Sequence, residues 1–169
     1  ISTEQVRQLS KTETVFQPDG TNPLTTTTKF FYDNPDNLQA TRTESADSKG
    51  NIIKIISRTP LEKNYINTST PLTPTASAAI DNMLARNIIS PVLQQEEYKA
   101  NVLQSRSLVN YKNWTPIILQ PENVQIQKGV SPIEFKLRMN AYDNAGNLLE
   151  QQKESNVKET YIWGYKSLY

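Results

Sequence analysis

A stretch near the end of the chain, YDNAGNLLEQ at residues 142–151, gathers side chains that could bind a ligand: a carboxylate, amides and a glycine. Such oxygen ligands hold Ca²⁺ in EF-hand loops, but those loops need them at alternate positions over about twelve residues, with a distal glutamate. The run DNAGNLLEQQKE supplies too few ligands in that register. The same residues are typical of a hairpin turn, in which Asp143 accepts backbone N–H groups and Gly146 is left-handed. We therefore expect a turn and no metal site.

Paired carboxylates offer a second chemistry, because glycoside hydrolysis needs two of them about 5–10 Å apart in a cleft. The candidate pairs are Glu96 with Glu97, and Glu150 with Glu154. Adjacent residues on a strand point to opposite faces, which separates Glu96 from Glu97. The other pair lies in a polar hairpin arm and is expected to be solvated. We predict no enzymatic activity, and a carboxylate-dependent glycosidase is the third interpretation.

Composition excludes several classes of site. The chain has no cysteine and no histidine, which excludes disulfides, thiolate nucleophiles, Ser-His-Asp catalysis and imidazole-bound zinc. The 18 basic and 17 acidic residues give a net charge of +1, and no basic stripe indicates nucleic-acid binding. No basic amphipathic segment and no run of about 18 apolar residues indicates membrane binding or insertion. No cofactor is expected.

The chain of 169 residues suits one domain or two small ones, and its 36% hydrophobic content predicts a thin, sheet-like core. We divide it into a polar N-terminal segment, residues 1–28, and a mainly β module of antiparallel hairpins, residues 29–169, which contains one helix. Residues 60–75 hold three prolines and are expected to be a linker or a long loop. The N-terminus lacks the pattern of a signal peptide, and we expect the chain to be a fragment of a longer protein.

One helix is predicted over residues 73–90, with Thr73 as its cap and Pro74 in its first turn. Ser90-Pro91 is expected to end it. The apolar stripe at helical spacing consists of Ala76, Ala79, Ile80, Met83, Leu84 and Ile88.

The β pattern is strongest at residues 133–141, where apolar and polar residues alternate as in a half-buried antiparallel strand. Residues 29–59 predict a hairpin with Gly50 at positive φ. Residues 157–165 predict a last strand, with Tyr161, Trp163 and Tyr165 on one face.

Two other segments are similar to YDNAGNLLEQ. Residues 32–41, YDNPDNLQAT, have Asp36 in place of the glycine, and residues 47–52, DSKGNI, keep the Asp, Gly and Asn. Asp tolerates the left-handed region better than most residues, so each copy is predicted to encode a strand, a tight turn and a strand. The residues assigned to these turns are Tyr32, Asp33, Asn37, Asp47, Gly50, Asn51, Tyr142, Asp143, Gly146 and Asn147.

The motif Tyr-Asp-x-x-Gly-Asn-Leu at residues 142–148, followed by YIWGY at 161–165, resembles the YD repeat of the Rhs family. The segments MLARNIISPVLQQEEY and NYKNWTPIILQPENVQIQKG resemble the region that precedes those repeats in large secreted proteins of Gram-negative bacteria. The resemblance covers residues 30–169. It departs from the family in having one full copy of the motif, and in ending where a longer protein would continue.

The resemblance implies a curved sheet of YD-repeat type that forms part of a shell around a toxin, in a secreted or cell-surface protein. The partners would be further repeats of the same polypeptide, or another protein chain, bound through exposed sheet edges. The alternative is an adhesion or carbohydrate-binding module. For that role the candidate aromatic residues are Tyr161, Trp163 and Tyr165 with Tyr142, which we expect to be packed in the core, and Trp114, which we expect to be exposed.

Overall fold

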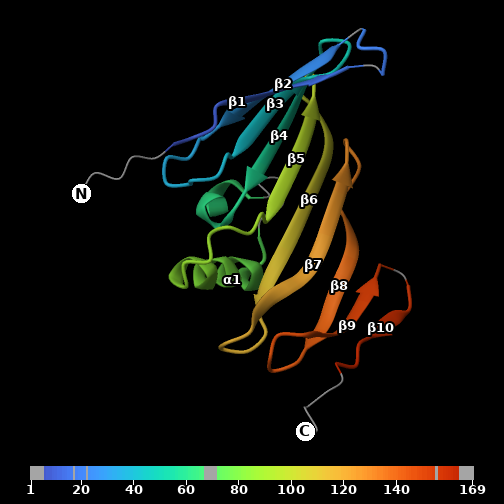
Figure 1. Ribbon diagram of the computed structural model, residues 1–169. Coiled ribbons are helices and arrows are strands. Elements are labelled where there is room, and N and C mark those ends of the chain that lie inside the picture. The colour runs from blue at the N-terminus through green and yellow to red at the C-terminus, as the bar shows by residue number, and fades with distance from the viewer. Residues whose placement is uncertain (1–5, 17, 22, 67–71, 155, 164–169) are drawn as a thin grey trace, which may run out of the picture.

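The computed structural model describes residues 6–16, 18–21, 23–66, 72–154 and 156–163, and it shows one open antiparallel sheet of ten strands (Figure 1). Each strand lies beside its neighbours in the sequence, so the sheet is a continuous meander. The mainly β antiparallel fold class is therefore confirmed. The strands are β1 (Ser10–Val15), β2 (Leu24–Phe31), β3 (Arg42–Ala46), β4 (Ile52–Arg58), β5 (Gln94–Lys99), β6 (Val102–Asn113), β7 (Leu119–Lys128), β8 (Glu134–Tyr142), β9 (Leu148–Lys153) and β10 (Lys158–Thr160).

Two helices lie on one side of the sheet, both in the connection from β4 to β5 (Figure 1). Residues 60–75 were predicted to be a linker or a long loop. This prediction is wrong in part, because the first six of these residues form the 3-10 helix η1 (Pro60–Tyr65). The α-helix α1 (Pro74–Ala85) begins as predicted, since Thr73 accepts a hydrogen bond from the Ala76 N–H at 3.2 Å.

The helix α1 ends before Ser90-Pro91, which corrects its predicted C-terminus. Asn87 adopts the left-handed conformation with φ of 55°, and the Ile88 N–H donates to the Met83 carbonyl at 2.8 Å. This arrangement satisfies carbonyls that the last helical turn leaves without partners. Leu84 and Ile88, which were expected in the apolar stripe, are 37% and 36% exposed and lie outside the core.

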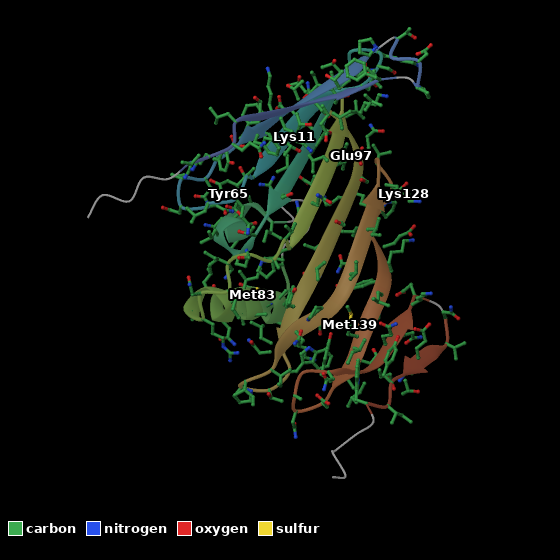
Figure 2. All side chains as sticks on the ribbon, viewed as in Figure 1. Lys11, Tyr65, Met83, Glu97, Lys128 and Met139 are labelled. Atoms are coloured by element: carbon green, nitrogen blue, oxygen red, sulfur yellow. The ribbon has the colours of Figure 1, made fainter. Side chains whose placement is uncertain are left out.

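The remaining stripe residues of α1 face β6 and are buried, and Ile80 and Met83 belong to a small core there (Figure 2 labels Met83). Met83, Leu93 and Leu108 are each at most 2% exposed. The core has a single layer of helix on one face of the sheet, which agrees with the low hydrophobic content. Its other members are Ile66 and Ile80, with Leu72, Tyr111 and Leu119 packed at its border.

By comparison, the strands at the two ends of the sheet are exposed to solvent. Every residue of β1 and the first four residues of β2 are exposed. Threonine hydroxyls pair across these strands, with Thr12 3.1 Å from Thr27 and Thr14 3.1 Å from Thr25. The predicted boundary between the N-terminal segment and the β module, between residues 28 and 29, falls inside β2. Both β1 and β2 belong to the same sheet as the other strands.

The last strand is shorter than predicted. The expected strand over 157–165 is confined to β10, whose three residues are all exposed. At the predicted strand 133–141 the alternation holds over its first half, where Phe135 and Leu137 are half-buried while Glu134 and Lys136 are exposed.

Candidate functional site

The stretch 142–151 forms the tight turn between β8 and β9. The Asp143 N–H donates to the Asn147 carbonyl at 2.9 Å, and the Gly146 N–H donates to the Asp143 carbonyl at 3.0 Å. The Asp143 carboxylate accepts from the N–H groups of Ala145 and Asn147 and from the Asn147 amide, at 2.8–2.9 Å. Gly146 closes the turn with φ of 84°. These hydrogen bonds hold the pKa of Asp143 below its ordinary value, chiefly those from Asn147.

The turn between β3 and β4 repeats this pattern. The Asp47 carboxylate accepts from the N–H groups of Lys49 and Asn51 at 2.9 and 2.8 Å, and Gly50 has φ of 79°. Lys99 adds an ion pair at 2.7 Å, and its contact is the main reason why the pKa of Asp47 lies well below its usual range. Asp-x-x-Gly-Asn is therefore a single turn structure that the chain uses twice.

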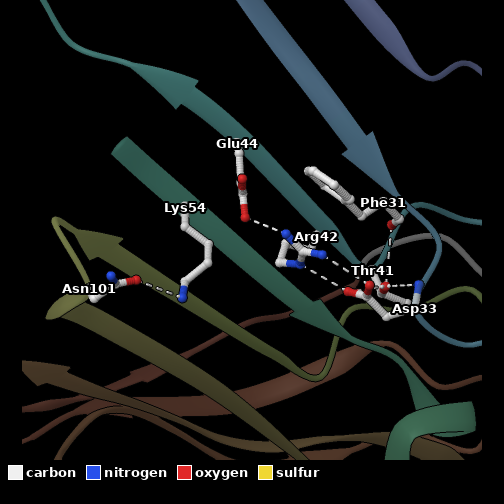
Figure 3. Close-up of polar contacts among 7 residues, drawn as sticks. All are labelled: Phe31, Asp33, Thr41, Arg42, Glu44, Lys54 and Asn101. Carbon is white, nitrogen blue, oxygen red and sulfur yellow. Dashed lines mark hydrogen bonds and ion pairs between the residues drawn. The ribbon is translucent and has the colours of Figure 1, made fainter. Parts of the chain in front are cut away.

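The third copy, residues 32–41, does not form this turn, and Asp33 contacts Thr41 and Arg42 instead (Figure 3). The whole segment connects β2 to β3, and Asp36 does not adopt a positive φ, so the backbone does not close as it does at Gly146. Asp33 instead accepts from the Arg42 guanidinium at 3.0 and 3.1 Å. This contact lowers the pKa of Asp33. Tyr32 reaches back to the segment before β1, where its hydroxyl donates to the Gln8 carbonyl at 3.1 Å.

Asn37, which was assigned to this turn, is instead 3% exposed and binds Glu62 in η1. Its amide donates to the Glu62 carboxylate at 3.0 and 3.2 Å, and the same carboxylate accepts from the Thr59 N–H at 2.8 Å. Burial alone would raise the pKa of Glu62, but these hydrogen bonds outweigh it and hold the pKa below its ordinary value. The network joins the connection between β2 and β3 to η1.

Sequence reasoning missed this network, although one signal for it was present. The run Thr59-Pro60-Leu61-Glu62 has the Ser/Thr-x-x-Glu spacing of a capping box, in which the two ends of a first helical turn cap each other. The contact with Asn37 had no local signal, because the two residues are far apart in the sequence.

The carboxylates Glu96 and Glu97 lie on opposite faces of β5, as predicted. Glu96 is 3% exposed and pairs with Arg106 at 2.7 Å and with Arg58 at 3.4 Å. Glu97 is exposed on the other face. In the second pair, Glu150 binds Lys158 at 2.9 Å and Glu154 binds Arg138 at 3.2 Å, so each carboxylate has its own cation.

The predicted aromatic residues are distributed differently from the prediction. Tyr161 and Trp163 were expected in the core but are 37% and 58% exposed, because the chain leaves the strand after Thr160. The Trp163 indole N–H donates to the Leu148 carbonyl at 2.5 Å. Tyr165 lies outside the described residues.

Trp114, expected to be exposed, is half-buried beside the turn that contains Gly146. Its ring meets Tyr142 edge to face at 5.0 Å between centroids, and its indole N–H donates to the Gln120 carbonyl at 3.3 Å. The Tyr142 hydroxyl donates to the Pro121 carbonyl at 2.9 Å. Burial, with a contribution from Tyr111, raises the pKa of Tyr142 to about 12.

A hollow of about 330 Å³ opens beside Trp114 on the side of the sheet that carries the α1 cap, Thr73. Cations lie over both of its rings: Lys112 is 4.6 Å from the Trp114 centroid and Arg138 is 3.6 Å from that of Phe135. Its lining also includes the amides of Asn110, Asn123 and Gln125, and Asn123 forms hydrogen bonds with the other two at 2.9 and 3.0 Å. Aromatic rings, amides and cations are the groups that bind saccharides and other polar ligands.

The described part of the chain holds neither a cluster of metal ligands nor a membrane-spanning helix. No group of three or more carboxylates there is placed to hold a metal ion. No helix among those residues has the length and apolar character needed to span a membrane. Comparisons with models of protein families, with curated proteins and with solved structures find no match to this chain.

Proposed function

We propose that this chain is a non-catalytic structural module of an Rhs/YD-repeat protein that is secreted or displayed on the cell surface. In this role it is a segment of β-sheet scaffold that encloses or presents a toxin. The observation that carries the proposal is the order of the strands. Ten strands follow one another across the sheet in sequence order, so the sheet can be extended by adding strands at either edge without rearranging any of them.

The bulges of the sheet support a curved scaffold. The register shifts within each of the four strand pairs from β5–β6 to β8–β9. Such irregularities bend the bulged strand and increase its twist, and they are the usual means of curving a sheet toward closure. A shell needs such curvature, whereas a flat binding platform does not.

The repeated turn supports the same proposal. In a meander, successive turns alternate between the two ends of the sheet, so the turn with Asp47 and the turn with Asp143 lie at opposite ends. The carboxylates of Asp47 and Asp143 accept hydrogen bonds from backbone N–H groups of their own turns. The motif thus reverses the chain locally at either end of the sheet, as a scaffold of hairpins requires.

The complete reading frame of the gene tests the proposal. We expect it to encode further copies of Tyr-Asp-x-x-Gly-Asn-Leu, each between alternating apolar and polar segments. A reading frame without such copies contradicts the scaffold function.

A second function, carbohydrate binding, is favoured by the hollow beside Trp114. Its lining includes the rings of Trp114 and Phe135 and the amides of Asn110, Asn123 and Gln125, which can stack on a sugar ring and form hydrogen bonds with its hydroxyl groups. A glycan array with the wild-type chain and with Trp114→Ala tests this function, and Trp163→Ala is the control because Trp163 is not part of the hollow. Binding lost only in Trp114→Ala supports it. Under the scaffold function, no glycan binds and Trp114→Ala lowers the stability by about 2 kcal/mol.

A further inference from the structure

The strand β1 is an open edge whose hydrogen-bonding groups can be assigned. The Phe30 N–H donates to the Leu9 carbonyl at 2.9 Å, so Leu9 and Phe30 are a hydrogen-bonded pair. Pairing alternates along an antiparallel ladder, and therefore Lys11 and Glu13 bond to β2 while Ser10, Thr12 and Thr14 direct their N–H and carbonyl groups away from the sheet.

The backbone of β1 is regular enough to pair with another strand. It has no proline, its register with β2 is continuous over all six residues, and its side chains are exposed on both faces. Natural sheets protect their edges with prolines, bulges, charged side chains or very short strands, and of these β1 has only the charges of Lys11 and Glu13. The other edge offers a shorter strand for pairing, because β10 has only three residues.

We propose that β1 pairs antiparallel with β1 of a second copy of this chain, about a two-fold axis at Thr12. Thr12 then faces Thr12 of the second copy, and Ser10 faces Thr14. These are the residues with outward groups, so each facing pair exchanges both of its backbone hydrogen bonds. This proposal rests on the scaffold function, since it names the partner of one sheet edge.

Lys11 and Glu13 form an ion pair at 2.6 Å within β1, and an axis at Thr12 joins the pairs of the two copies into a network of four alternating charges. With the axis at Thr12, Lys11 lies opposite Glu13 of the second copy on each side of the axis, and opposite charges facing across a ladder stabilise it. An axis at Lys11 would place the two Lys11 side chains opposite each other, and an axis at Glu13 would do the same for Glu13. A shift by an odd number of residues would place outward groups against inward ones.

The ends of the paired strands are also complementary. Leu9 falls opposite Val15 of the second copy, and both are exposed in the single chain, at 69% and 66%. Val15 lies beside Leu24 of β2 in its own sheet. Pairing therefore covers apolar side chains at both ends of β1, with threonines on the opposite face.

Sedimentation equilibrium of the 169-residue chain over a range of concentrations tests the proposal. We expect a weak dimer, because the interface of two short strands is small. Lys11→Glu and Glu13→Lys each place like charges opposite one another, and each is expected to weaken the dimer about tenfold or more. An equimolar mixture of the two variants restores opposite charges in this register, so it is expected to dimerise as the wild type does. Lys158→Glu, on the other edge, is the control and leaves the dimer unchanged.

A second variant tests the backbone directly. Thr12→Pro removes an N–H that points away from the sheet, a position where an edge strand tolerates proline, so the fold is kept and the dimer is lost. Circular dichroism and the midpoint of thermal unfolding check the fold. A monomeric wild type at all concentrations, or a dimer that persists in Thr12→Pro and in both charge variants, overturns this pairing. Neither result bears on the reading frame, which tests the scaffold function separately.

Discussion

The middle of the sheet and its two ends are built differently. In the middle, α1 covers the strands, and Met83, Leu93 and Leu108 are buried together with the ion pair of Glu96 and Arg106. At the ends, no residue of β1 or β10 is buried, and the strands are held by ladders and turns. The difference indicates that the middle supplies the stability and that the ends are free to bind other strands.

The largest change in stability that tests this comparison is expected for a substitution in the core. Met83→Ala removes a side chain that is 1% exposed and leaves a cavity between α1 and the sheet. We expect the free energy of unfolding to fall by about 2–5 kcal/mol, measured by urea denaturation. Leu24→Ala, at the bare end of β2, is the matched control and should change it by less than about 0.5 kcal/mol. Equal losses in the two variants would contradict the division.

The next largest loss of stability is expected on substitution of Glu62. Its buried carboxylate accepts hydrogen bonds that join η1 to residues 32–41. Glu62→Gln replaces an acceptor oxygen by a donor and is expected to reduce the stability by about 1–3 kcal/mol near neutral pH. The folded-state pKa of Glu62 lies below its ordinary value of 4.5, so its contribution is present above that value and is lost as the pH falls through the folded-state pKa.

The pH dependence separates this effect from a general loss of packing. The wild type should lose stability more steeply below about pH 4.5 than Glu62→Gln does, in urea denaturation at a series of pH values. Parallel curves for the two proteins would show that Glu62 is protonated alike in the folded and unfolded states.

The two Asp-x-x-Gly-Asn turns differ in their surroundings, and matched glycine variants measure the difference. Both glycines have positive φ, which an alanine adopts at a cost of about 1–2 kcal/mol. A Cβ at Gly146 would also lie 3.1 Å from the Gln120 amide nitrogen, whereas one at Gly50 would meet no atom within 4 Å. Gly146→Ala should therefore lower the thermal midpoint more than Gly50→Ala. The reverse order would contradict the assigned geometry.

The smallest effect is expected where the sheet is bare. Thr14→Val removes a hydroxyl that lies 3.1 Å from that of Thr25, with both residues exposed. The free energy of unfolding should change by less than about 0.5 kcal/mol. A larger loss in urea denaturation would show that the β1–β2 hairpin contributes to the stability of the middle.

Local chemistry explains which parts of this structure were predictable. The turn at Asp143 and Gly146, the start of α1 at Thr73 and the hairpin at Gly50 depend on residues within a few positions of one another. The pattern of the chain therefore contains their signals.

The errors arose where distant contacts decide the outcome. Residues 32–41 resemble the turn motif, but the Asn37 side chain forms hydrogen bonds with Glu62, which is 25 residues away in the sequence. The exposed positions of Tyr161 and Trp163 follow from the end of β10, which no residue pattern marks.

Hydrogen exchange at the edge strand β10 tests the scaffold function most directly. The Tyr161 N–H donates to the Leu149 carbonyl, so the N–H groups of Lys158 and Thr160 point away from the sheet. In the 169-residue chain these two amides should exchange rapidly. In the full product of the reading frame they should be strongly protected, because the next strand of the scaffold pairs with them. Equally rapid exchange in both proteins would contradict the account.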